Sequence, residues 1–391
     1  NLPSSRAIPA PPHFKIQFSA KENPLRGTGK LLGLAGMAMG GLLIVATPAG
    51  AHSPGQALSE QAQRDELADL LESGAELVEA GDLAEALARY QHAAGLAEDN
   101  AKIFSAIGYL QARQGNFQAA IAAFQTAIGL EPNNLAVYFG LAHAHSNLGE
   151  YEAAGNAYRQ ILRLQPDNQA AQLGLGAALF QTAAFEEALA IYTKLLQQDP
   201  NNLQAAESIG LILLQQGNTD AAIAALERAA ILAPQASRIQ LNLGIAHLKA
   251  GNMASALTAF RAAAAEEPRN ADIRMQIGYL LWQQGNLDAA LESYQQAARL
   301  QPDSVIAHDA IADLYFEQQE VLMTIVAHRE VLEMAPDHAP GYYHLGVALE
   351  ARGRRAEAIA ALQRAKTLLL EQENGEDAQI VDELLQKLQS S

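Results

Sequence analysis

Residues 271–304 read ADIRMQIGYLLWQQGNLDAALESYQQAARLQPDS, a run of 34 residues whose spacing recurs along most of the chain. Gly278 and Ala290 stand at positions 8 and 20, where only a small side chain lets one helix approach another closely. Glycine tolerates the left-handed conformation that ends a helix, so Gly285 predicts a turn between two helices. Pro302 stops the second helix, because proline cannot continue it. The run therefore predicts two antiparallel helices.

A regular spacing of prolines extends this pattern over most of the sequence. Seven prolines follow one another at intervals of 34 residues: Pro132, Pro166, Pro200, Pro234, Pro268, Pro302 and Pro336. A frame with proline at position 32 gives nine units, which begin at Leu67, Ala101, Leu135, Gln169, Leu203, Ser237, Ala271, Val305 and Ala339. An unbroken period of this length is typical of a repeat protein.

Three positions of the frame predict how the helices pack. Position 8 is Gly or Ala in all nine units, and position 20 is Ala in eight of them. Position 24 is Tyr, Phe or Leu in eight units, a bulky side chain that wedges between the helices. The eighth unit departs at both of the latter positions, with Thr324 and His328. Since no unit can bury its own apolar face, we expect the nine to stack into an all-helical solenoid.

The segments on either side of the repeats differ in composition. Residues 52–66 are expected to be a linker and the start of the first helix, and residues 67–372 to hold the nine repeats. Apolar residues recur at helical spacing from Ile380 to Leu388. Residues 373–391 therefore predict a final helix that caps the exposed end of the core with a polar outer face.

Residues 1–51 have the pattern of a secretory signal peptide with a basic lead-in. Five basic residues precede an uncharged, largely apolar segment over 31–51, and small residues at 49–51 fit cleavage before His52. The sequence thus predicts an exported protein, in the periplasm or alternatively the thylakoid lumen. The competing interpretation is a retained membrane anchor, because residues 31–51 are just long enough to span a bilayer as a helix.

Composition excludes several classes of function. The net charge is −17, and about −21 without residues 1–51, which hold five basic residues and one acidic residue. Nucleic-acid binding is not expected, because it depends on Lys and Arg that neutralise phosphates. The absence of cysteine excludes disulfides and thiolate metal sites. No phosphate loop, zinc-protease helix or serine-hydrolase elbow is present, so no enzyme activity is expected.

The repeat pattern resembles that of the tetratricopeptide repeat (TPR) family, with small residues at positions 8 and 20, an aromatic residue at 24 and proline at 32. The resemblance implies a right-handed superhelix whose first helices line a concave groove for a partner protein or peptide. It places partner contacts at positions 2, 5, 9, 12 and 13. The candidate groove residues are Lys102, Tyr109, Arg113, Phe139, Asn147, Tyr279, Trp282, Phe316 and Tyr343. The alternative for each aromatic side chain is packing against a neighbouring helix.

The eighth repeat carries an acidic stripe. Asp309, Asp313 and Glu317 are spaced by four residues, so they share one helix face and repel one another. Hard cations such as Mn²⁺, Ca²⁺ or Mg²⁺ prefer carboxylate oxygens, and His344 in the next unit supplies an imidazole that Mn²⁺ accepts. The stripe spans about 12 Å, so one ion would take two carboxylates at most. The alternative is an acidic surface that faces a basic peptide or only water.

The leading functional prediction is an exported scaffold that holds a partner protein during assembly or maturation of a membrane complex. Within the TPR family, nine repeats behind an export signal resemble the cyanobacterial periplasmic processing-associated TPR proteins. That resemblance implies photosystem II assembly, binding of the D1 precursor and Mn²⁺ delivery, with peripheral membrane association. The alternative is a general adaptor between envelope proteins that has no metal role.

Overall fold

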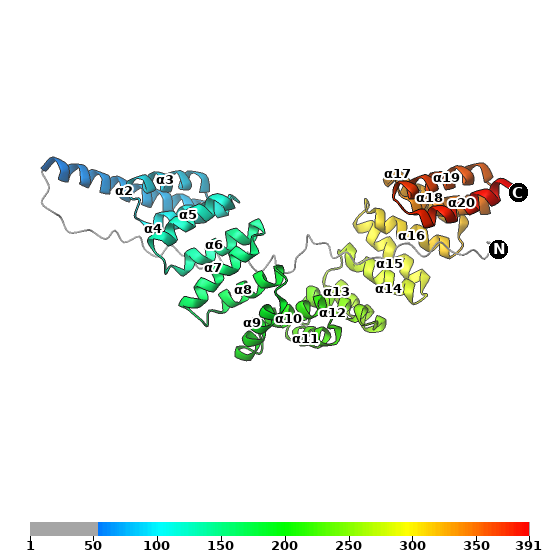
Figure 1. Ribbon diagram of the computed structural model, residues 1–391, viewed down its shortest axis with the longest axis horizontal. Coiled ribbons are helices and arrows are strands. Elements are labelled where there is room, and N and C mark those ends of the chain that lie inside the picture. The colour runs from blue at the N-terminus through cyan, green and yellow to red at the C-terminus, as the bar shows by residue number, and fades with distance from the viewer. Residues whose placement is uncertain (1–53, 391) are drawn as a thin grey trace. The chain divides into compact units, whose positions relative to one another are not determined.

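The computed structural model describes residues 54–390, and every regular element in that range is an α-helix (Figure 1). The predicted all-helical fold is therefore confirmed. The described residues fall into two compact units, an N-terminal unit up to Gln216 and a C-terminal unit from Gly217 onward. The signal peptide or anchor predicted within residues 1–51 lies outside the described residues. Of the helices in 54–390, none combines the length and apolar character that crossing a membrane requires.

From residue 54 onward, the N-terminal unit consists of nine helices in hairpin order. They are α2 (Pro54–Ala80), α3 (Leu83–Leu96), α4 (Ala101–Arg113), α5 (Phe117–Leu130), α6 (Leu135–Leu148), α7 (Tyr151–Leu164), α8 (Gln169–Gln181), α9 (Phe185–Gln198) and α10 (Leu203–Gln215). Helix α2 begins at Pro54, so the segment before the first repeat continues its first helix. We call α2, α4 and each further even-numbered helix up to α18 a first helix, and the helix that follows it a second helix.

The C-terminal unit continues the same alternation. Its helices are α11 (Thr219–Leu232), α12 (Ser237–Lys249), α13 (Met253–Glu266), α14 (Ala271–Gln283), α15 (Leu287–Leu300), α16 (Val305–Glu317), α17 (Val321–Met334), α18 (Ala339–Ala351), α19 (Arg355–Glu371) and α20 (Gly375–Ser390). From α4 to α18, every first helix begins at position 1 of the 34-residue frame. Helix α20 packs on α19, and Val381, Leu385 and Leu388 join the apolar cluster at this end.

The turn inside each repeat depends on a left-handed residue. Gly285 has φ +75°, and the glycines at the same position of six other repeats are also left-handed. The fourth and eighth repeats lack glycine there, yet Ala183 and Gln319 adopt the same conformation with φ 57° and 59°. Because a Cβ makes this conformation costly, packing on both sides must impose it at these two turns.

The small residue at position 8 makes room for the bulky residue at position 24. A Cβ added to Gly278 would lie 2.5 Å from Cε1 of Tyr294, and one added to Gly108 would lie 2.6 Å from Cδ1 of Phe124. Both rings are fully buried. The helices of a repeat can therefore approach this closely only because these residues lack a side chain.

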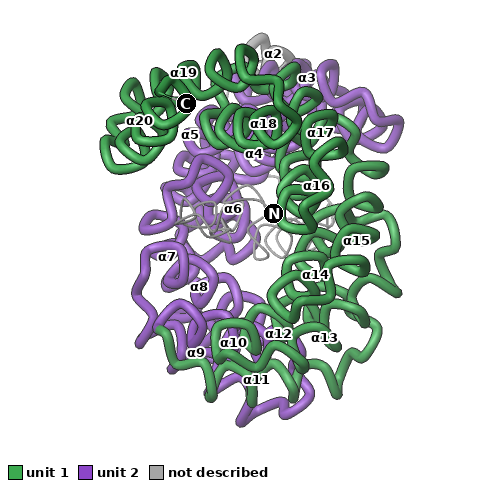
Figure 2. Tube along the Cα trace, turned by 90° about the vertical axis from the view of Figure 1, so that its right-hand side faces the viewer, with its two compact units in different colours: residues 1–17, 217–391 green, residues 18–216 purple. Residues whose placement is uncertain are grey.

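Within each unit, successive first helices lie next to one another. Helix α4 contacts α6, α8 contacts α10, and α16 contacts α18, whereas successive second helices do not approach one another to the same extent. A row of helices bends toward the side on which its members are closer. The first helices therefore line the inner side of each unit, as the tube view shows for each unit separately (Figure 2).

Candidate functional site

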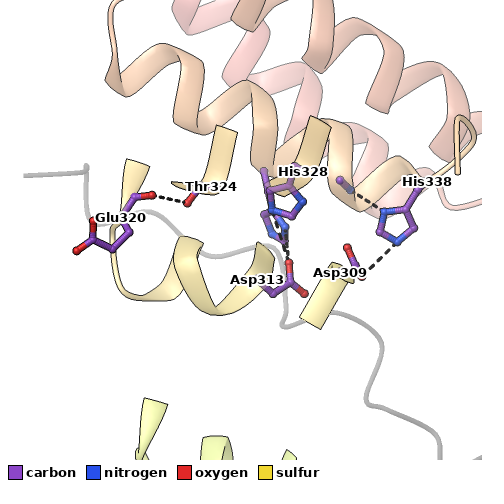
Figure 3. A network of polar contacts seen from close by, with 8 residues as sticks. Asp309, Asp313, Glu320, Thr324, His328 and His338 are labelled. Atoms are coloured by element: carbon purple, nitrogen blue, oxygen red, sulfur yellow. Dashed lines mark hydrogen bonds and ion pairs between the residues drawn. The ribbon is translucent and has the colours of Figure 1, made fainter. Parts of the chain in front are cut away.

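A group of titratable side chains is buried in the C-terminal unit, where α16, α17 and α18 meet (Figure 3). Asp313 comes from α16, His328 from α17 and His344 from α18, and we call these three residues the buried triad. Oδ1 of Asp313 lies 2.9 Å from Nδ1 of His344 and 3.9 Å from Nε2 of His328. One ligand-type atom from each residue lies within 4.8 Å of those of the other two.

The triad is enclosed by protein. The exposed fraction is 0% for His328, 7% for Asp313 and 9% for His344. Neither ring nitrogen of His328 has a hydrogen-bond partner among the described residues, and the same holds for Oδ1 of Asp313 and Nδ1 of His344. Oδ1 of Asp313 and Nδ1 of His344 therefore lie within ion-pair distance, but their geometry is not that of a hydrogen bond. Buried polar atoms without partners are uncommon in proteins, so the triad needs an explanation.

The repeat frame explains how these side chains come together. Asp313 is at position 9 of its repeat, on the face of α16 that meets α18. His328 occupies position 24, where the preceding repeat places the buried ring of Tyr294. His344 is at position 6 of the next first helix. The ring of Phe316 stacks on His344 with centroids 4.4 Å apart, and the rings of His328 and His344 have centroids 5.1 Å apart.

Next to the triad lies a second pair, Asp309 and His338. Oδ2 of Asp309 lies 3.4 Å from Nε2 of His338 (Figure 3). His338 is the residue before α18, and its Nδ1 accepts a hydrogen bond of 3.1 Å from the N–H of Gly341. Asn168 and Asn202 cap α8 and α10 in the same way in other repeats. Because Nδ1 is an acceptor, the proton of the neutral His338 ring is on Nε2, which faces the carboxylate of Asp309.

Burial shifts the protonation of these groups. Desolvation raises the pKa of Asp309 to about 8, and the nearby charge of Asp313 adds to the effect. Desolvation lowers the pKa of His328 to about 3, with a further contribution from His344. The pKa of His338 is also lowered, mainly by burial. Perturbed groups gathered in one place are typical of functional sites, although structural networks produce them too.

The structure brings together two of the four residues predicted for a metal site. Asp313 and His344 are neighbours, whereas Asp309 faces His338. Glu317 lies apart from the triad at the surface, where its Oε2 accepts a hydrogen bond from Nε1 of Trp282. The three carboxylates of the acidic stripe are therefore not gathered around one point, in keeping with the expectation that one ion would take two of them at most. Positions 5, 9 and 13 of α16 share a face, but each meets a different neighbour.

His328 is not among the residues that the sequence predicts for a metal site. In the repeat pattern it stands out only as a departure from the bulky apolar side chain at position 24. That departure was the available signal, because a histidine at a position that is fully buried in other repeats must be placed in the core. Its partners could not be read from helical spacing, since they come from two other helices.

The candidate groove residues of the N-terminal unit lie on its first helices. Lys102 and Arg113 are exposed on α4, and Tyr109 is half-buried between them. Nη1 of Arg113 donates a hydrogen bond of 2.8 Å to the hydroxyl of Tyr109, and the guanidinium lies 5.7 Å from the ring centroid. On α6, Asn147 is exposed and donates to the carbonyl oxygen of His143 at 2.8 Å. Phe139 is half-buried.

The candidate groove residues of the C-terminal unit divide into two kinds. Tyr279, Trp282 and Phe316 are half-buried on α14 and α16. Tyr343 is only 7% exposed and belongs to the apolar cluster formed with α19 and α20. Its predicted role as a partner contact is therefore corrected, because this ring packs inside the protein. The alternative given for the aromatic residues applies to Tyr343.

Two models of one protein family match this chain. A family model described as tetratricopeptide repeat matches residues 139–202, 207–272, 241–305, 275–321 and 327–378. A second model with the same description matches residues 111–156. No curated protein sequence matches the chain. The narrower resemblance to cyanobacterial processing-associated proteins therefore stays a prediction.

Two solved structures share the fold. A tetratricopeptide repeat protein from Parabacteroides merdae ATCC 43184 is 20% identical, with a TM-score of 0.51, and the match covers 64% of this chain and 98% of that one. The C-terminal part of a TPR repeat-containing protein from Cytophaga hutchinsonii is 16% identical, with a TM-score of 0.53, and the match covers 61% and 98% of the two chains. At these identities the likeness establishes the fold alone.

Proposed function

Because the chain belongs to the tetratricopeptide repeat family, we propose that it is a scaffold that binds partner proteins or peptides on its first helices. The observation that carries this proposal is the face of α4. Lys102, Tyr109 and Arg113 share that face in a chain whose net charge is −17. A basic and aromatic surface on an acidic protein is suited to capture of a negatively charged segment.

The pairing of Arg113 with Tyr109 supports this use of α4. The hydrogen bond to the phenol oxygen and the position near the ring hold the guanidinium in place before any partner arrives. A guanidinium that is already ordered loses less entropy when it binds a carboxylate, and it can do so with two parallel hydrogen bonds. Lys102 adds a second positive charge that a partner carboxylate can reach.

A separate surface in the C-terminal unit suits an apolar side chain. Trp282 on α14 and Phe316 on α16 are half-buried, so part of each residue is open to solvent. The indole N–H of Trp282 is directed to Glu317, which fixes the orientation of the ring. Partly exposed tryptophan in a fixed orientation is common among the residues that dominate protein interfaces.

The finer function that we propose is assembly or maturation of a membrane complex after export. The pattern of residues 1–51 supports export to the periplasm, with the thylakoid lumen or an anchor in the membrane as alternatives. Under this proposal the partner is a membrane-complex subunit, such as the D1 precursor of photosystem II, and the protein carries Mn²⁺ to it. The second candidate is an envelope adaptor without a metal role, which the surfaces on α4 and α14 would serve equally well.

Capture of solubilised membrane proteins by the immobilised full chain tests the proposal. We expect Lys102→Glu with Arg113→Glu to abolish retention of acidic partners, and Arg228→Glu, on second helix α11, to leave it unchanged. Equal retention by all three proteins would contradict binding on α4. A parallel run with Mn²⁺ or chelator, with purified D1 precursor as a defined probe, separates the two candidates. Retention only with Mn²⁺ favours metal-coupled assembly, and equal retention favours the adaptor.

A further inference from the structure

We propose that Asp313, His328 and His344 form a binding site for one divalent transition-metal ion of the Zn²⁺ type. The site lies entirely within the C-terminal unit, and its three ligands are not among the residues of the partner surfaces on α4 and α14. It also differs from the acidic stripe in its ligands, since two of the three donors are imidazole nitrogens. Its components come from three consecutive helices of adjoining repeats.

The distances within the triad fit a single small ion. Zn²⁺ binds imidazole nitrogen and carboxylate oxygen at about 2.0–2.2 Å, which places neighbouring ligand atoms of a tetrahedron about 3.4 Å apart. Oδ1 of Asp313 lies 2.9 Å and 3.9 Å from the two imidazole nitrogens. These two separations bracket the tetrahedral value, and the three ligand atoms all lie within 4.8 Å of one another, so modest rotations of the side chains would bring them onto one ion.

The ring nitrogens of His328 lack hydrogen-bond partners within residues 54–390, and Nε2 lies near the carboxylate of Asp313. His328 is 0% exposed, and neither of its ring nitrogens has a hydrogen-bond partner in the described part of the chain. A buried polar group without a partner destabilises the folded state, because its hydrogen bonds to water are lost and not replaced. Six of the other eight repeats place an aromatic ring at position 24 and two place leucine. Among these residues, the hydroxyl of Tyr294 is also buried without a partner in the described part of the chain, but His328 leaves two such atoms there. A metal bond to Nε2 of His328 would replace the missing partner.

The ligand atoms of Asp313 and His344 also lack hydrogen-bond partners among the described residues. Oδ1 of Asp313 and Nδ1 of His344 are the two atoms that lie 2.9 Å apart, and both lack a hydrogen bond of acceptable geometry. Each is an atom that a metal ion accepts as a ligand. The stacked ring of Phe316 covers His344 and holds its plane. An apolar cover of this kind limits access of solvent to a bound ion.

The donor set selects the class of metal. Ca²⁺ and Mg²⁺ take oxygen ligands, usually six or more, and the triad offers one carboxylate. Imidazole nitrogen suits Zn²⁺, Cu²⁺, Ni²⁺ and Fe²⁺, and affinity for such a site rises from Mn²⁺ toward Cu²⁺, with Zn²⁺ well above Mn²⁺. Three protein ligands leave a fourth position of the tetrahedron for water. We therefore expect tighter binding of Zn²⁺ than of Mn²⁺.

Calorimetric titration of the chelator-treated full chain with Zn²⁺ alone tests the site. His328→Leu is the informative variant, because Leu226 and Leu362 occupy the same frame position in other repeats and the core should accept it. We expect the wild-type protein to bind one equivalent of Zn²⁺ at this site. In His328→Leu and in Asp313→Asn, this binding should be lost, or its affinity should fall about 100-fold or more. Glu317→Gln is the matched control, and it should bind like the wild type.

The outcomes separate the triad from other histidines and from the acidic stripe. The loss of one equivalent in both triad variants, with Glu317→Gln unchanged, supports the site. Equal stoichiometry and affinity in the wild type and in His328→Leu would overturn it, as would absence of Zn²⁺ binding by the wild type. Tighter binding of Mn²⁺ than of Zn²⁺ in a parallel titration would overturn the assignment of metal class. Thermal unfolding of each metal-free variant checks that it is folded.

Discussion

Oδ1 of Asp313 lies 2.9 Å from Nδ1 of His344, although the two residues belong to different repeats and to helices α16 and α18. Helix α17 lies between them in the chain and supplies His328, so one short stretch of the solenoid gathers three ligand-type side chains. The preceding repeats have apolar residues or glycine at several of these positions. This departure from the repeat pattern is what distinguishes the eighth and ninth units from the rest.

The first prediction concerns the two turns that lack glycine. Ala183→Gly and Gln319→Gly should each raise the free energy of unfolding by about 1 kcal/mol, because φ values of 57° and 59° are costly for residues with a Cβ. Chemical denaturation measures the change. The reverse substitution Gly285→Ala, at a turn with φ +75°, should destabilise by a similar amount. Unchanged midpoints for both glycine variants would show that these turns are not strained.

The second prediction concerns the close approach of helices within a repeat. Gly278→Ala should lower the free energy of unfolding by about 1–3 kcal/mol, because the new Cβ would lie 2.5 Å from the buried ring of Tyr294. Gly129→Ala on α5 is the matched control, since nothing lies within 4 Å of its added Cβ. There, replacement of a glycine in the last turn of α5 should leave the free energy of unfolding unchanged or raise it by less than about 1 kcal/mol. If both variants lose stability equally, the packing explanation is wrong.

The third prediction is a dependence of stability on pH that comes from Asp309. Its pKa is raised to about 8 in the folded protein from an ordinary value near 3.8, so the folded state holds a proton that the unfolded state releases. The free energy of unfolding therefore falls as the pH rises from about 4 to about 8, and it levels off once the folded protein has also released the proton. His338 and Asp313 face the same carboxylate, and the lowered pKa values of His328 and His338 act in the opposite direction only below about 6.5.

The pH range in which Asp309 alone changes the stability is the range to measure. Thermal unfolding of the full chain in chelator should show a decline between pH 6.5 and pH 8, at up to about 1.4 kcal/mol per pH unit, that levels off above pH 8. Asp309→Asn cannot release the proton and should flatten the curve over the same range. A wild-type curve that is already flat between pH 6.5 and pH 8 would contradict the raised pKa.

The fourth prediction uses the single tryptophan of the chain. Trp282 is half-buried on α14, so its fluorescence reports on that surface without interference from other indoles. Binding of a partner with an apolar anchor should shift the emission, and Trp282→Ala should weaken capture about tenfold or more. Ile231→Ala, on the second helix α11 and 79% exposed, should leave capture unchanged. Equal capture by both variants would remove Trp282 from the interface.

Most of the fold could be predicted from the sequence because the repeat supplies nine copies of the same physical constraints. Gly285 and its counterparts mark turns, and Ala271 and its counterparts from the second repeat onward are the first residues of helices. The left-handed conformation of Ala183 and Gln319 could not be read from residue type, because packing of the flanking helices imposes it. The pairing of position 8 with position 24 became visible only when the ring of Tyr294 was placed against Gly278.

The site was less predictable for a definite reason. Helical spacing correctly put Asp309, Asp313 and Glu317 on one face of α16, but spacing along one helix does not say which neighbour each side chain meets. Asp313 meets His344 and His328, and Asp309 meets His338. Glu317 extends to Trp282 at the surface. The contacts that define the triad are formed between helices, so sequence periodicity alone could not assign them.

Hydrogen exchange of the full chain, alone and with its captured partner, tests most directly whether the first helices are the binding surface. We predict that added protection is concentrated in first helices, on α4 around Tyr109 and Arg113 and on α14 around Trp282. Second helices such as α5 and α15 should exchange as they do in the free protein. Protection confined to second helices, or none within residues 54–390, would contradict the account.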